Sequence, residues 1–407
     1  MKEVCIINYA SNASIYGIGT YLREYMRCLT RMGYRVNLIE LGLDENNHEI
    51  YVTEKGLMRT IHIPYVSRGS MNTYNKCICR LLRLYLVDSV ELIFHFHYLQ
   101  SSSLFMHIKK YFPLSKSVLT VHYLYWSARF NGNLIVYENI IKKRNREGIK
   151  RKYKDVIENH QQEKDFICAV DKTVCLAFDT YKLLTELYGI KEEKLFVAPN
   201  GLALGKKMLS AEMKKELRRK FHIQDNEKVI IFVGRINRIK GVYPLLSCFD
   251  KIVDKYPDCR MVLIGDGDIN DVIKYAREAI SKITFVGRLD KRKLYQWYSI
   301  ADIAVFPSYY EECSYVGIEM LMHGIPVVAS DGYAVRNMFS KDNAVIAAIK
   351  KWDKSDEFEN SLINAVFSLL ESDELSKNKR KQALQEYYRT YQLKCMQKKY
   401  VELFTAL

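Results

Sequence analysis

Carboxylates and cations directly follow apolar runs in the second half of the chain. In parallel α/β proteins, the residues that follow such strands commonly bind ligands. Glu311 and Glu319 lie eight positions apart, after the expected strand 303–306 and across an expected strand-to-helix junction. Arg235 and Lys240 follow another expected strand. Ligands of open α/β sheets bind outside the carboxyl ends of the strands, and an Arg fork grips two phosphate oxygens at once. The pattern predicts a site for a sugar carried on a nucleoside diphosphate, although the two cations alone also fit an ordinary surface loop.

The backbone that follows the strand at 303–306 is expected to add an anion site. A helix is expected to begin at about Glu319, and the backbone N–H groups of Tyr315 to Gly317 would then point at an anion. We expect Glu319 to accept hydrogen bonds from two vicinal ribose hydroxyls, and Glu311 to accept them from the transferred sugar. Two alternatives stay open. A carboxylate in the first turn also favours a helix start, and paired carboxylates also serve glycoside hydrolysis.

The first half of the chain offers a glycine-containing turn near its start. Gly17 and Gly19 lie between the first expected strand and a helix, and glycine lets a backbone approach a phosphate or sugar closely. As a dinucleotide fingerprint the pattern is incomplete, because Leu22 stands where the third glycine of G-x-G-x-x-G belongs. This departure disfavours a dinucleotide-binding dehydrogenase.

Three histidines lie at the ends of expected strands in the first half of the chain. His95 and His97 follow one strand, and His122 follows the next one, which ends in Leu-Thr-Val. A structural role is favoured for His95 and His97. His122 is the better candidate for contact with substrate, because it lies at a carboxyl end that is expected to face an interdomain cleft.

Composition limits the class of protein. A chain of 407 residues exceeds the size of a single hydrophobic core. A hydrophobic content of 48% argues against wholesale disorder, and no run approaches the roughly 18 apolar residues that span a bilayer. The N-terminal residues read as the start of a strand and not as a signal peptide. A cytoplasmic location is therefore expected. Peripheral attachment to the inner face of the plasma membrane is compatible with it. Cys77-x-Cys79 has no second pair, so no metal site is expected.

The net charge of +15 is partly concentrated in the basic stretch 142–154. A solvated helix face is the favoured interpretation. Attraction to an anionic membrane surface, or to an acidic or phospholipid-linked acceptor, is the functional alternative. Nucleic acid is disfavoured as a partner because no nucleic-acid-binding motif accompanies the charge.

Short apolar runs alternate with amphipathic helical stretches, which predicts an α/β fold with parallel sheets covered by helices on both faces. We expect domains at 1–200 and 201–384, with a C-terminal helix at about 385–407 packing back on the first domain. The expected strands are 4–8, 36–41, 92–95, 117–121 and 172–176 in the first domain, and 228–233, 260–264, 283–286, 303–306 and 326–329 in the second.

Taken together, these features resemble the retaining glycosyltransferases of family 4, whose GT-B fold has two Rossmann-like domains facing a central cleft. The resemblance is carried by the E-x7-E spacing of Glu311 and Glu319, by H-G-I-P-V-V-A-S at 323–330, and by V-G-R-x4-K-G at 233–241. It implies that the cations bind the diphosphate and that Val286 contacts the nucleotide base. The implied catalytic residues are His122 and Glu311, and the implied donor-binding residues are Gly17, Gly19, Gly234, Arg235, Lys240, Val286, Ser314, Tyr315, Val316 and Glu319.

The resemblance also implies a reaction. A UDP- or GDP-linked sugar would pass, with retention, to a glycan, lipid-linked or peptide acceptor, without a metal or other cofactor, in the synthesis of cell-surface polysaccharide or glycoconjugate. Glu311-Glu312-Cys313-Ser314 replaces the family's common E-G-F-G, which leaves the sugar open. A nucleotide-sugar epimerase or glycan phosphorylase of the same fold, and a noncatalytic binder of anionic glycans or membranes, are the alternatives.

Overall fold

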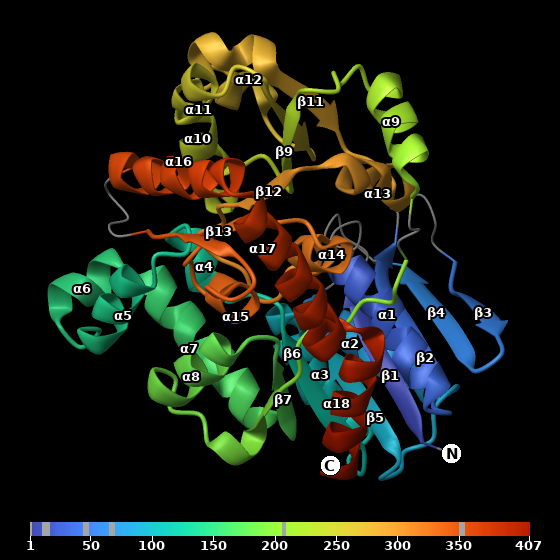
Figure 1. The fold of residues 1–407 in the computed structure, drawn as a ribbon. Helices are drawn as coiled ribbons and strands as arrows, with labels where there is room; N and C mark the ends of the chain where they lie inside the picture. Colours follow the sequence, from blue (N-terminus) through green and yellow to red (C-terminus); the bar gives the residue numbers. More distant parts are fainter. Residues whose placement is uncertain (1, 10–16, 44–48, 65–69, 206–208, 350–354) are drawn as a thin grey trace. The chain divides into compact units, whose positions relative to one another are not determined.

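The computed structural model describes residues 2–9, 17–43, 49–64, 70–205, 209–349 and 355–407 (Figure 1). The chain forms two compact units, each described by itself: the first comprises 1–125, 138–201 and 393–407, and the second 126–137 and 202–392. The expected division differs from this in two places. Residues 126–137 group with the second unit, and the chain returns to the first unit at Leu393 instead of about 385.

The first unit is built on an eight-stranded sheet with the strand order β3-β4-β2-β1-β5-β6-β7-β8. All neighbouring strands are parallel except β3 and β4, which form an antiparallel hairpin. The strands are β1 (Glu3–Tyr9), β2 (Arg35–Leu43), β3 (Tyr51–Lys55), β4 (Met58–Pro64), β5 (Leu92–Phe96), β6 (Lys116–Val121), β7 (Lys172–Cys175) and β8 (Leu195–Val197).

The expected strands of the first unit are present, and three strands were not predicted. The middle of β1 is fully buried, because a central parallel strand is covered on both faces. By contrast, β3 is almost wholly exposed, so it has no apolar alternation that a sequence reading could detect. β4 and the three-residue strand β8 were missed as well.

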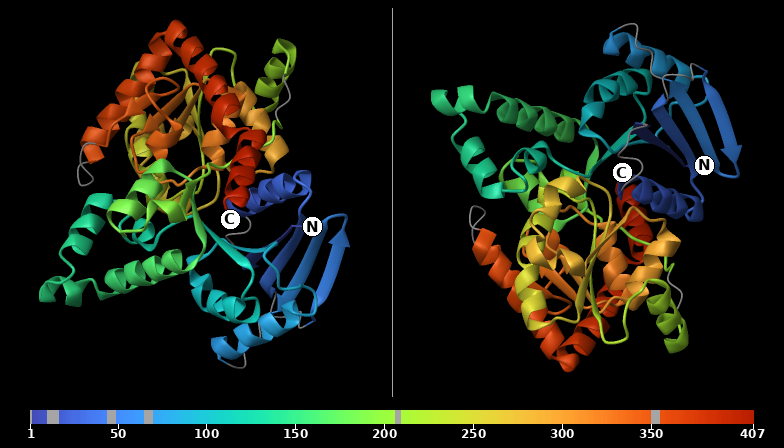
Figure 2. Two further views of the ribbon diagram at one scale, coloured as in Figure 1. Left: turned by 90° about the horizontal axis from the view of Figure 1, so that it is seen from below. Right: turned by 90° about the horizontal axis from the view of Figure 1, so that it is seen from above.

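Helices cover both faces of the first sheet: α1 and α18 lie on one face, and α2 and α3 on the other (Figure 2). Leu22, Tyr25 and Leu29 of α1 are buried at helical spacing. α18 belongs to this unit, which confirms the prediction that the C-terminal helix packs back on the first domain. The helices are α1 (Gly17–Arg31), α2 (Met71–Leu82), α3 (Ser102–Tyr111), α4 (Tyr125–Arg129), α5 (Leu134–Lys142), α6 (Glu147–Lys152), α7 (Lys154–Ala169), α8 (Phe178–Glu186) and α18 (Leu393–Thr405), where α4 and α5 cross the boundaries between the units.

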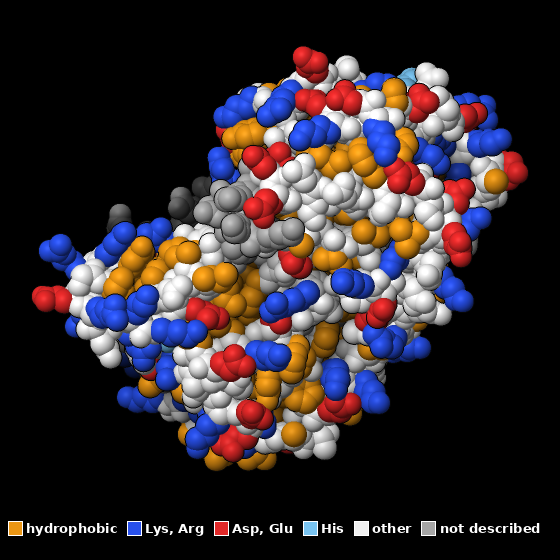
Figure 3. Space-filling view, turned by 60° about the vertical axis from the view of Figure 1, so that its left-hand side comes forward, with side chains coloured by type: hydrophobic (Ala, Val, Ile, Leu, Met, Phe, Trp, Pro, Cys, Tyr) orange, Lys and Arg blue, Asp and Glu red, His pale blue; other side chains and the backbone are white. Residues whose placement is uncertain are grey.

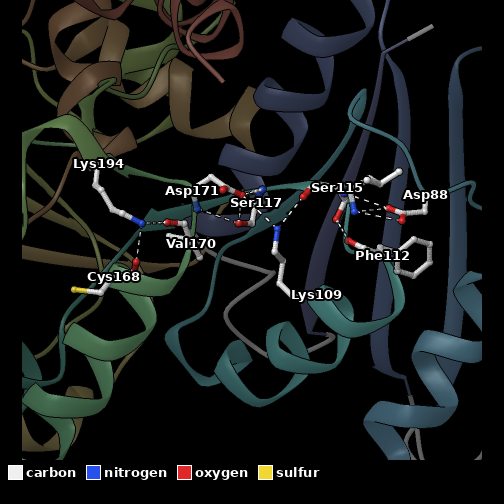
Figure 4. A network of polar contacts seen from close by, with 10 residues as sticks. Asp88, Lys109, Phe112, Ser115, Ser117, Cys168, Val170, Asp171 and Lys194 are labelled. Atoms are coloured by element: carbon white, nitrogen blue, oxygen red, sulfur yellow. Dashed lines mark hydrogen bonds and ion pairs between the residues drawn. The ribbon is translucent and has the colours of Figure 1, made fainter.

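Side-chain carboxylates secure the amino ends of β6 and β7 (Figure 4). Asp171 Oδ2 accepts hydrogen bonds from the backbone N–H and the hydroxyl of Ser117, at 2.8 and 2.6 Å. Asp88 Oδ1 accepts from the backbone N–H groups of Leu114 and Ser115, at 3.1 and 3.2 Å. These contacts fix the loops at the edge of the sheet opposite to His122, so that the carboxyl edge, where chemistry is expected, rests on a well-anchored strand pair.

The second unit has a six-stranded, fully parallel sheet with the order β11-β10-β9-β12-β13-β14. The parallel α/β prediction is therefore confirmed, and β14 is the one unit-two strand that was not predicted. The strands are β9 (Lys228–Val233), β10 (Cys259–Ile264), β11 (Ile283–Gly287), β12 (Ile303–Phe306), β13 (Val327–Ser330) and β14 (Val345–Ala347).

A large apolar core lies on one face of this sheet, between its central strands and the helices α10, α11 and α16. The last helix of the unit, α17, runs into a π-helical turn, Tyr387–Tyr391. The helices are α9 (Ala211–Lys220), α10 (Val242–Ser247), α11 (Phe249–Lys255), α12 (Ile269–Ile273), α13 (Lys291–Ile300), α14 (Tyr315–His323), α15 (Val335–Met338), α16 (Ser355–Glu371) and α17 (Asp373–Glu386).

Candidate functional site

The two loops that carry the predicted cations and carboxylates leave neighbouring strands, β9 and β12, at the same edge of the second sheet. The backbone N–H of Tyr309 donates to the carbonyl of Ile239 at 2.9 Å and ties the loops together. Gly241 has φ +69°, and a Cβ on it would lie 2.0 Å from the carbonyl oxygen of Pro307. Only glycine satisfies both conditions, so the K-G pair of the motif exists because the two loops touch.

Lys240 and Glu311 meet across these loops. Lys240 Nζ lies 2.6 Å from Glu311 Oε1, and the two side chains are 20% and 8% exposed. The Asn237 side chain caps the short 3-10 helix Arg238–Lys240 by accepting a hydrogen bond from the backbone N–H of Lys240. This bond fixes the backbone from which the lysine side chain extends. The structure thus brings together two residues that were predicted separately, one for a diphosphate and one for a sugar.

Glu319 is fully buried, and its carboxylate has partners that the sequence did not reveal. Lys291 Nζ forms an ion pair with Oε1, and the Tyr298 hydroxyl donates to Oε2 at 3.4 Å. Burial together with the Glu319 carboxylate raises the pKa of Tyr298 well above its usual value, so Tyr298 keeps its proton and remains a donor. Because Lys291 opens the helix after β11, its place after a strand end is the signal that could have found it.

The helix after the β12 loop begins at Tyr315, so the expectation that Glu319 stands in its first turn is wrong. Ser314 is the N-cap residue, and its hydroxyl accepts from the backbone N–H of Gly317 at 3.5 Å. The N–H groups of Tyr315 and Val316, by helix geometry, have no acceptor inside the helix. Glu319 follows one turn later, so a match to the helix dipole does not explain it.

Glycines shape the rest of this edge. Gly234 has φ +153°. A Cβ on Gly265 would lie 1.8 Å from the carbonyl oxygen of Gly234, so position 265 has no room for a side chain. Arg235 directly follows Gly234 and is exposed. Val286 is partly exposed in the edge strand β11. At the end of this strand, the Gly287 carbonyl accepts a hydrogen bond from the backbone N–H of Gly265 at 3.0 Å.

An aromatic cluster that sequence reasoning missed supports the Glu311 loop. The rings of Tyr310 and Tyr333 stack with centroids 5.2 Å apart, and Trp126 meets both edge-on at 5.3 and 5.1 Å. The backbone also joins them, because Glu311 N–H donates to the Tyr333 carbonyl at 3.0 Å. Close approach of the 126–137 segment is visible at Gly132, where a Cβ would lie 2.8 Å from Tyr310 Cβ. No sequence pattern marks Trp126, because its partners lie far away along the chain.

The predicted residues of the first unit lie at the carboxyl edge of its own sheet. His122 follows β6 and is partly exposed, and its Nε2 lies 3.2 Å from Nδ1 of the buried His97. Burial lowers the pKa of His122 to about 3, so its imidazole is neutral at physiological pH. Gly17 and Gly19 lie in the first turn of α1, while residues 14–16, which precede them in the chain, lie outside the described residues. That these residues meet those of the second unit stays a prediction.

Two family models match successive parts of the chain. The model described as "Glycosyltransferase Family 4" matches residues 15–206, and the model described as "Glycosyl transferases group 1" matches residues 213–386. The matches adjoin at the boundary between the units, and together they leave only short segments unmatched.

Curated relatives match over part of the chain. An uncharacterized glycosyltransferase of Methanocaldococcus jannaschii is 34% identical over 149 residues, which are 35% of this chain and 38% of the relative. Alpha-monoglucosyldiacylglycerol synthase of Streptococcus pneumoniae is 30% identical over 181 residues, or 43% of this chain and 41% of the relative. The matched stretch thus spans about two fifths of the length of these relatives.

The fold is shared more widely than the sequence. The structure of HepE from Anabaena in complex with UDP superposes with a TM-score of 0.71 over 100% of both chains, at 14% identity. At this identity the likeness establishes the arrangement of strands and helices and does not establish the ligand.

Proposed function

The chain belongs to glycosyltransferase family 4 and has the GT-B fold, and on that premise we propose that it transfers a sugar from a nucleotide-linked donor to an acceptor hydroxyl. The donor is UDP- or GDP-linked. The acceptor is a glycan, a lipid-linked sugar or a peptide of the cell surface. Retention of the anomeric configuration and independence from metal ions and other cofactors are part of the proposal.

One observation carries the proposal: Lys240 and Glu311 touch at the carboxyl edge of the second sheet, beside the N-terminus of α14. A cation, a buried carboxylate and a helix N-terminus within two adjoining loops are the groups that a sugar diphosphate needs. Glu319 and its partner Lys291 extend the same edge along α14 and α13 with a second buried carboxylate, suited to vicinal ribose hydroxyls.

In the proposed reaction, the cations act on the phosphate and Glu311 acts on the sugar. When the bond between sugar and diphosphate breaks, negative charge grows on the departing phosphate. Lys240, Arg235 and the N–H groups at the start of α14 stabilise that charge in place of a metal ion. Glu311 orients the sugar through its hydroxyls, and the acceptor attacks from the side of the leaving phosphate, which retains the configuration. His122 is neutral, so it acts by donating or accepting a hydrogen bond at the sugar and not as a cation.

The identity of the donor and the stereochemistry of the transfer are tested together. Calorimetry with a panel of UDP- and GDP-linked sugars should find one donor that binds, and NMR of the product should show a retained anomeric centre in buffer containing EDTA. Substituting both Arg235 and Lys240 with Ala should abolish turnover while the variant stays folded, as its circular dichroism spectrum would show. Turnover by the double variant, or an inverted product, would contradict the proposal.

The proposal places the enzyme at an anionic membrane surface on the cytoplasmic side. In the part of the chain that the structure describes, no helix is long and apolar enough to cross a bilayer. The cations of the basic stretch 142–154 are exposed, and the glutamates Glu138 and Glu158 pair with only the first and last of them, Lys142 and Lys154. Figure 3 turns toward the viewer the side that carries α5 and α6, where Lys and Arg side chains gather with few Asp and Glu side chains among them.

Vesicle sedimentation tests this placement. Binding to vesicles of anionic phospholipid should weaken as salt rises, because screening shortens the reach of the charges. Substitution of Lys150, Arg151 and Lys152 with Gln should reduce the bound fraction. The matched control replaces three exposed lysines of α9, Lys214, Lys215 and Lys220, with Gln. Equal loss in the control, or binding that ignores salt, would contradict membrane docking through this stretch.

A further inference from the structure

A cluster of histidine and tyrosine rings, joined by one threonine, lies inside the apolar core of the first unit, between the sheet and the helices α1 and α18. We call it the His–Tyr cluster. Every member except His122 is at most 1% exposed, although each carries a polar group. Burying such groups is costly unless they are hydrogen-bonded, so the pattern of their bonds decides what the cluster does. Its members are Tyr21, Tyr25, His95, His97, Thr120, His122 and Tyr400.

One branch of the cluster is fully paired. The Tyr25 hydroxyl lies 2.5 Å from His95 Nδ1, and His95 Nε2 lies 2.8 Å from Thr120 Oγ1. The hydroxyls of Tyr21 and Tyr400 are 2.5 Å apart. Both ring nitrogens of His95 therefore have partners. The Tyr21 hydroxyl also lies 3.4 Å from Thr120 Oγ1 of β6. This branch therefore satisfies itself and connects α18, through α1, to the sheet, which is a structural role.

The other branch, formed by His97 and His122, contains one buried ring nitrogen without a hydrogen-bond partner among the described residues. His97 Nδ1 lies 3.2 Å from His122 Nε2, while His97 Nε2 is buried and finds no partner among the described residues. A neutral imidazole carries one N–H and one bare nitrogen. If His122 donated, His97 would have to carry its proton on the orphaned Nε2. Buried N–H groups without an acceptor are rarer than unsatisfied acceptors, so the proton belongs on Nδ1 of His97.

Packing keeps this arrangement in place. The ring of Tyr21 meets His122 edge-on, with centroids 4.6 Å apart, and meets His97 in the same manner at 5.2 Å. Desolvation lowers the pKa of His97 well below its usual value and that of His122 to about 3. Both rings are therefore neutral, and one tautomer of the pair excludes the other.

We propose that His97 is a positioning residue that donates its Nδ1–H to His122 Nε2 and so holds His122 in the Nδ1–H tautomer. His122 then presents an N–H donor, and not a bare nitrogen, to an oxygen of the bound ligand. The tautomer follows from the first unit alone. The identification of that oxygen with a hydroxyl or phosphate oxygen of the sugar donor rests on the proposed function.

NMR of the full chain labelled with ¹⁵N-histidine measures the tautomer directly, through two-bond correlations from the ring carbon protons to both ring nitrogens. The signals of the two rings are assigned with His97→Asn and His122→Gln. We expect both rings to carry the proton on Nδ1. His97→Asn keeps an N–H donor near the position of Nδ1 and should leave the His122 pattern unchanged, whereas His97→Phe fills the space without a donor and should shift the proton of His122 to Nε2.

His107→Asn is the matched control, because His107 is a partly exposed histidine of the same unit that bonds to Asn72, away from the cluster. It should leave the His122 signals untouched. An Nε2–H pattern for His122 in the unmodified protein overturns the proposal, as does an unchanged Nδ1–H pattern in a folded His97→Phe variant.

Kinetics separate this proposal from the proposed function. His97→Phe should lower kcat for sugar transfer roughly 10-fold or more, because the wrong tautomer offers no donor, while His97→Asn stays close to the unmodified protein. UDP or GDP binding should not change, since the predicted nucleotide contacts are on other residues. If the tautomer shifts as expected and kcat does not, His97 still positions His122, and the role of His122 at the sugar is what fails.

Discussion

Lys240 and Glu311 form an ion pair of 2.6 Å between the loops that follow β9 and β12. The pair explains why the two motifs occur together: the V-G-R-x4-K-G loop supplies the cation and the E-x7-E loop the carboxylate. A sugar diphosphate bound at this edge would take the lysine on its phosphate and the carboxylate on its sugar. The pair therefore holds each side chain close to where its ligand atoms would lie.

Breaking this pair should affect stability and catalysis differently. Lys240→Met leaves the nearly buried Glu311 carboxylate without its cation and should lower the free energy of unfolding by about 1–3 kcal/mol. Glu311→Gln in the same background should restore part of that loss, because no unpaired charge remains. Urea unfolding of the four proteins in a double-mutant cycle measures the coupling. Additive single effects would show that the ion pair contributes nothing.

The donor kinetics give the second readout of the same variants. Lys240→Met should reduce kcat by roughly 10²–10³-fold, because charge on the departing phosphate loses a preorganised cation. The double variant should stay inactive even though its stability partly recovers. Recovery of activity along with stability would assign Lys240 to the fold and not to the phosphate.

Glu319 should matter for the nucleotide. Glu319→Ala removes a fully buried acceptor and should weaken UDP or GDP binding by about 1–3 kcal/mol, measured by isothermal titration calorimetry. Glu278→Ala, at an exposed glutamate of the same unit, is the control and should bind as the unmodified protein does. Equal affinities of the two variants would remove Glu319 from the site.

Lys291 should be needed because it neutralises Glu319. Lys291→Ala removes the cation that pairs with the buried Glu319 carboxylate and should cost about 2 kcal/mol of stability. Lys293→Ala changes a neighbouring lysine on the same helix whose side chain is 62% exposed. It should cost less than about 0.5 kcal/mol, as exposed ion pairs contribute little. Thermal or urea unfolding of the two variants makes the comparison.

Gly241 tests whether the contact between loops, or only the backbone conformation, requires glycine. Gly241→Ala places a Cβ 2.0 Å from the Pro307 carbonyl oxygen at φ +69°, whereas Gly56 has φ +60° with nothing within 4 Å. Gly56→Ala should cost only the conformational term, about 1 kcal/mol. Gly241→Ala should cost more than about 3 kcal/mol and abolish turnover, since the loops must separate. Similar losses in the two variants would show that the close approach is unimportant.

Glu163 should make stability depend on pH. Burial raises its pKa from 4.5 to about 7, while the Tyr188 hydroxyl and the Tyr125 N–H bond to its two oxygens. Between these pH values the unfolded chain gives up the proton that the folded chain keeps, so stability falls as pH rises from 4.5 to about 7. The loss should reach about 3 kcal/mol. Unfolding of Glu163→Gln beside the unmodified protein, at several pH values, isolates this contribution; a constant difference between them would contradict it.

The sequence by itself determined the alternation of strands and helices, because the buried central strands leave short apolar runs between amphipathic helical stretches. It also determined the residue types at strand ends, and therefore the family. It missed β3, β4, β8 and β14, of which β3 is exposed and β8 and β14 are three residues long. It also placed Glu319 one turn too close to the helix start, because a cap at Ser314 is a matter of backbone geometry.

Only the tertiary structure decided which side chains meet. Lys291 with Glu319, Trp126 with Tyr310, and His97 with His122 are pairs separated by 28, 184 and 25 positions. No local spacing encodes such contacts, since they arise from the order of strands in a sheet and the packing of helices on it. The sequence names the groups that could act, and the fold determines their partners, their burial and hence their charge.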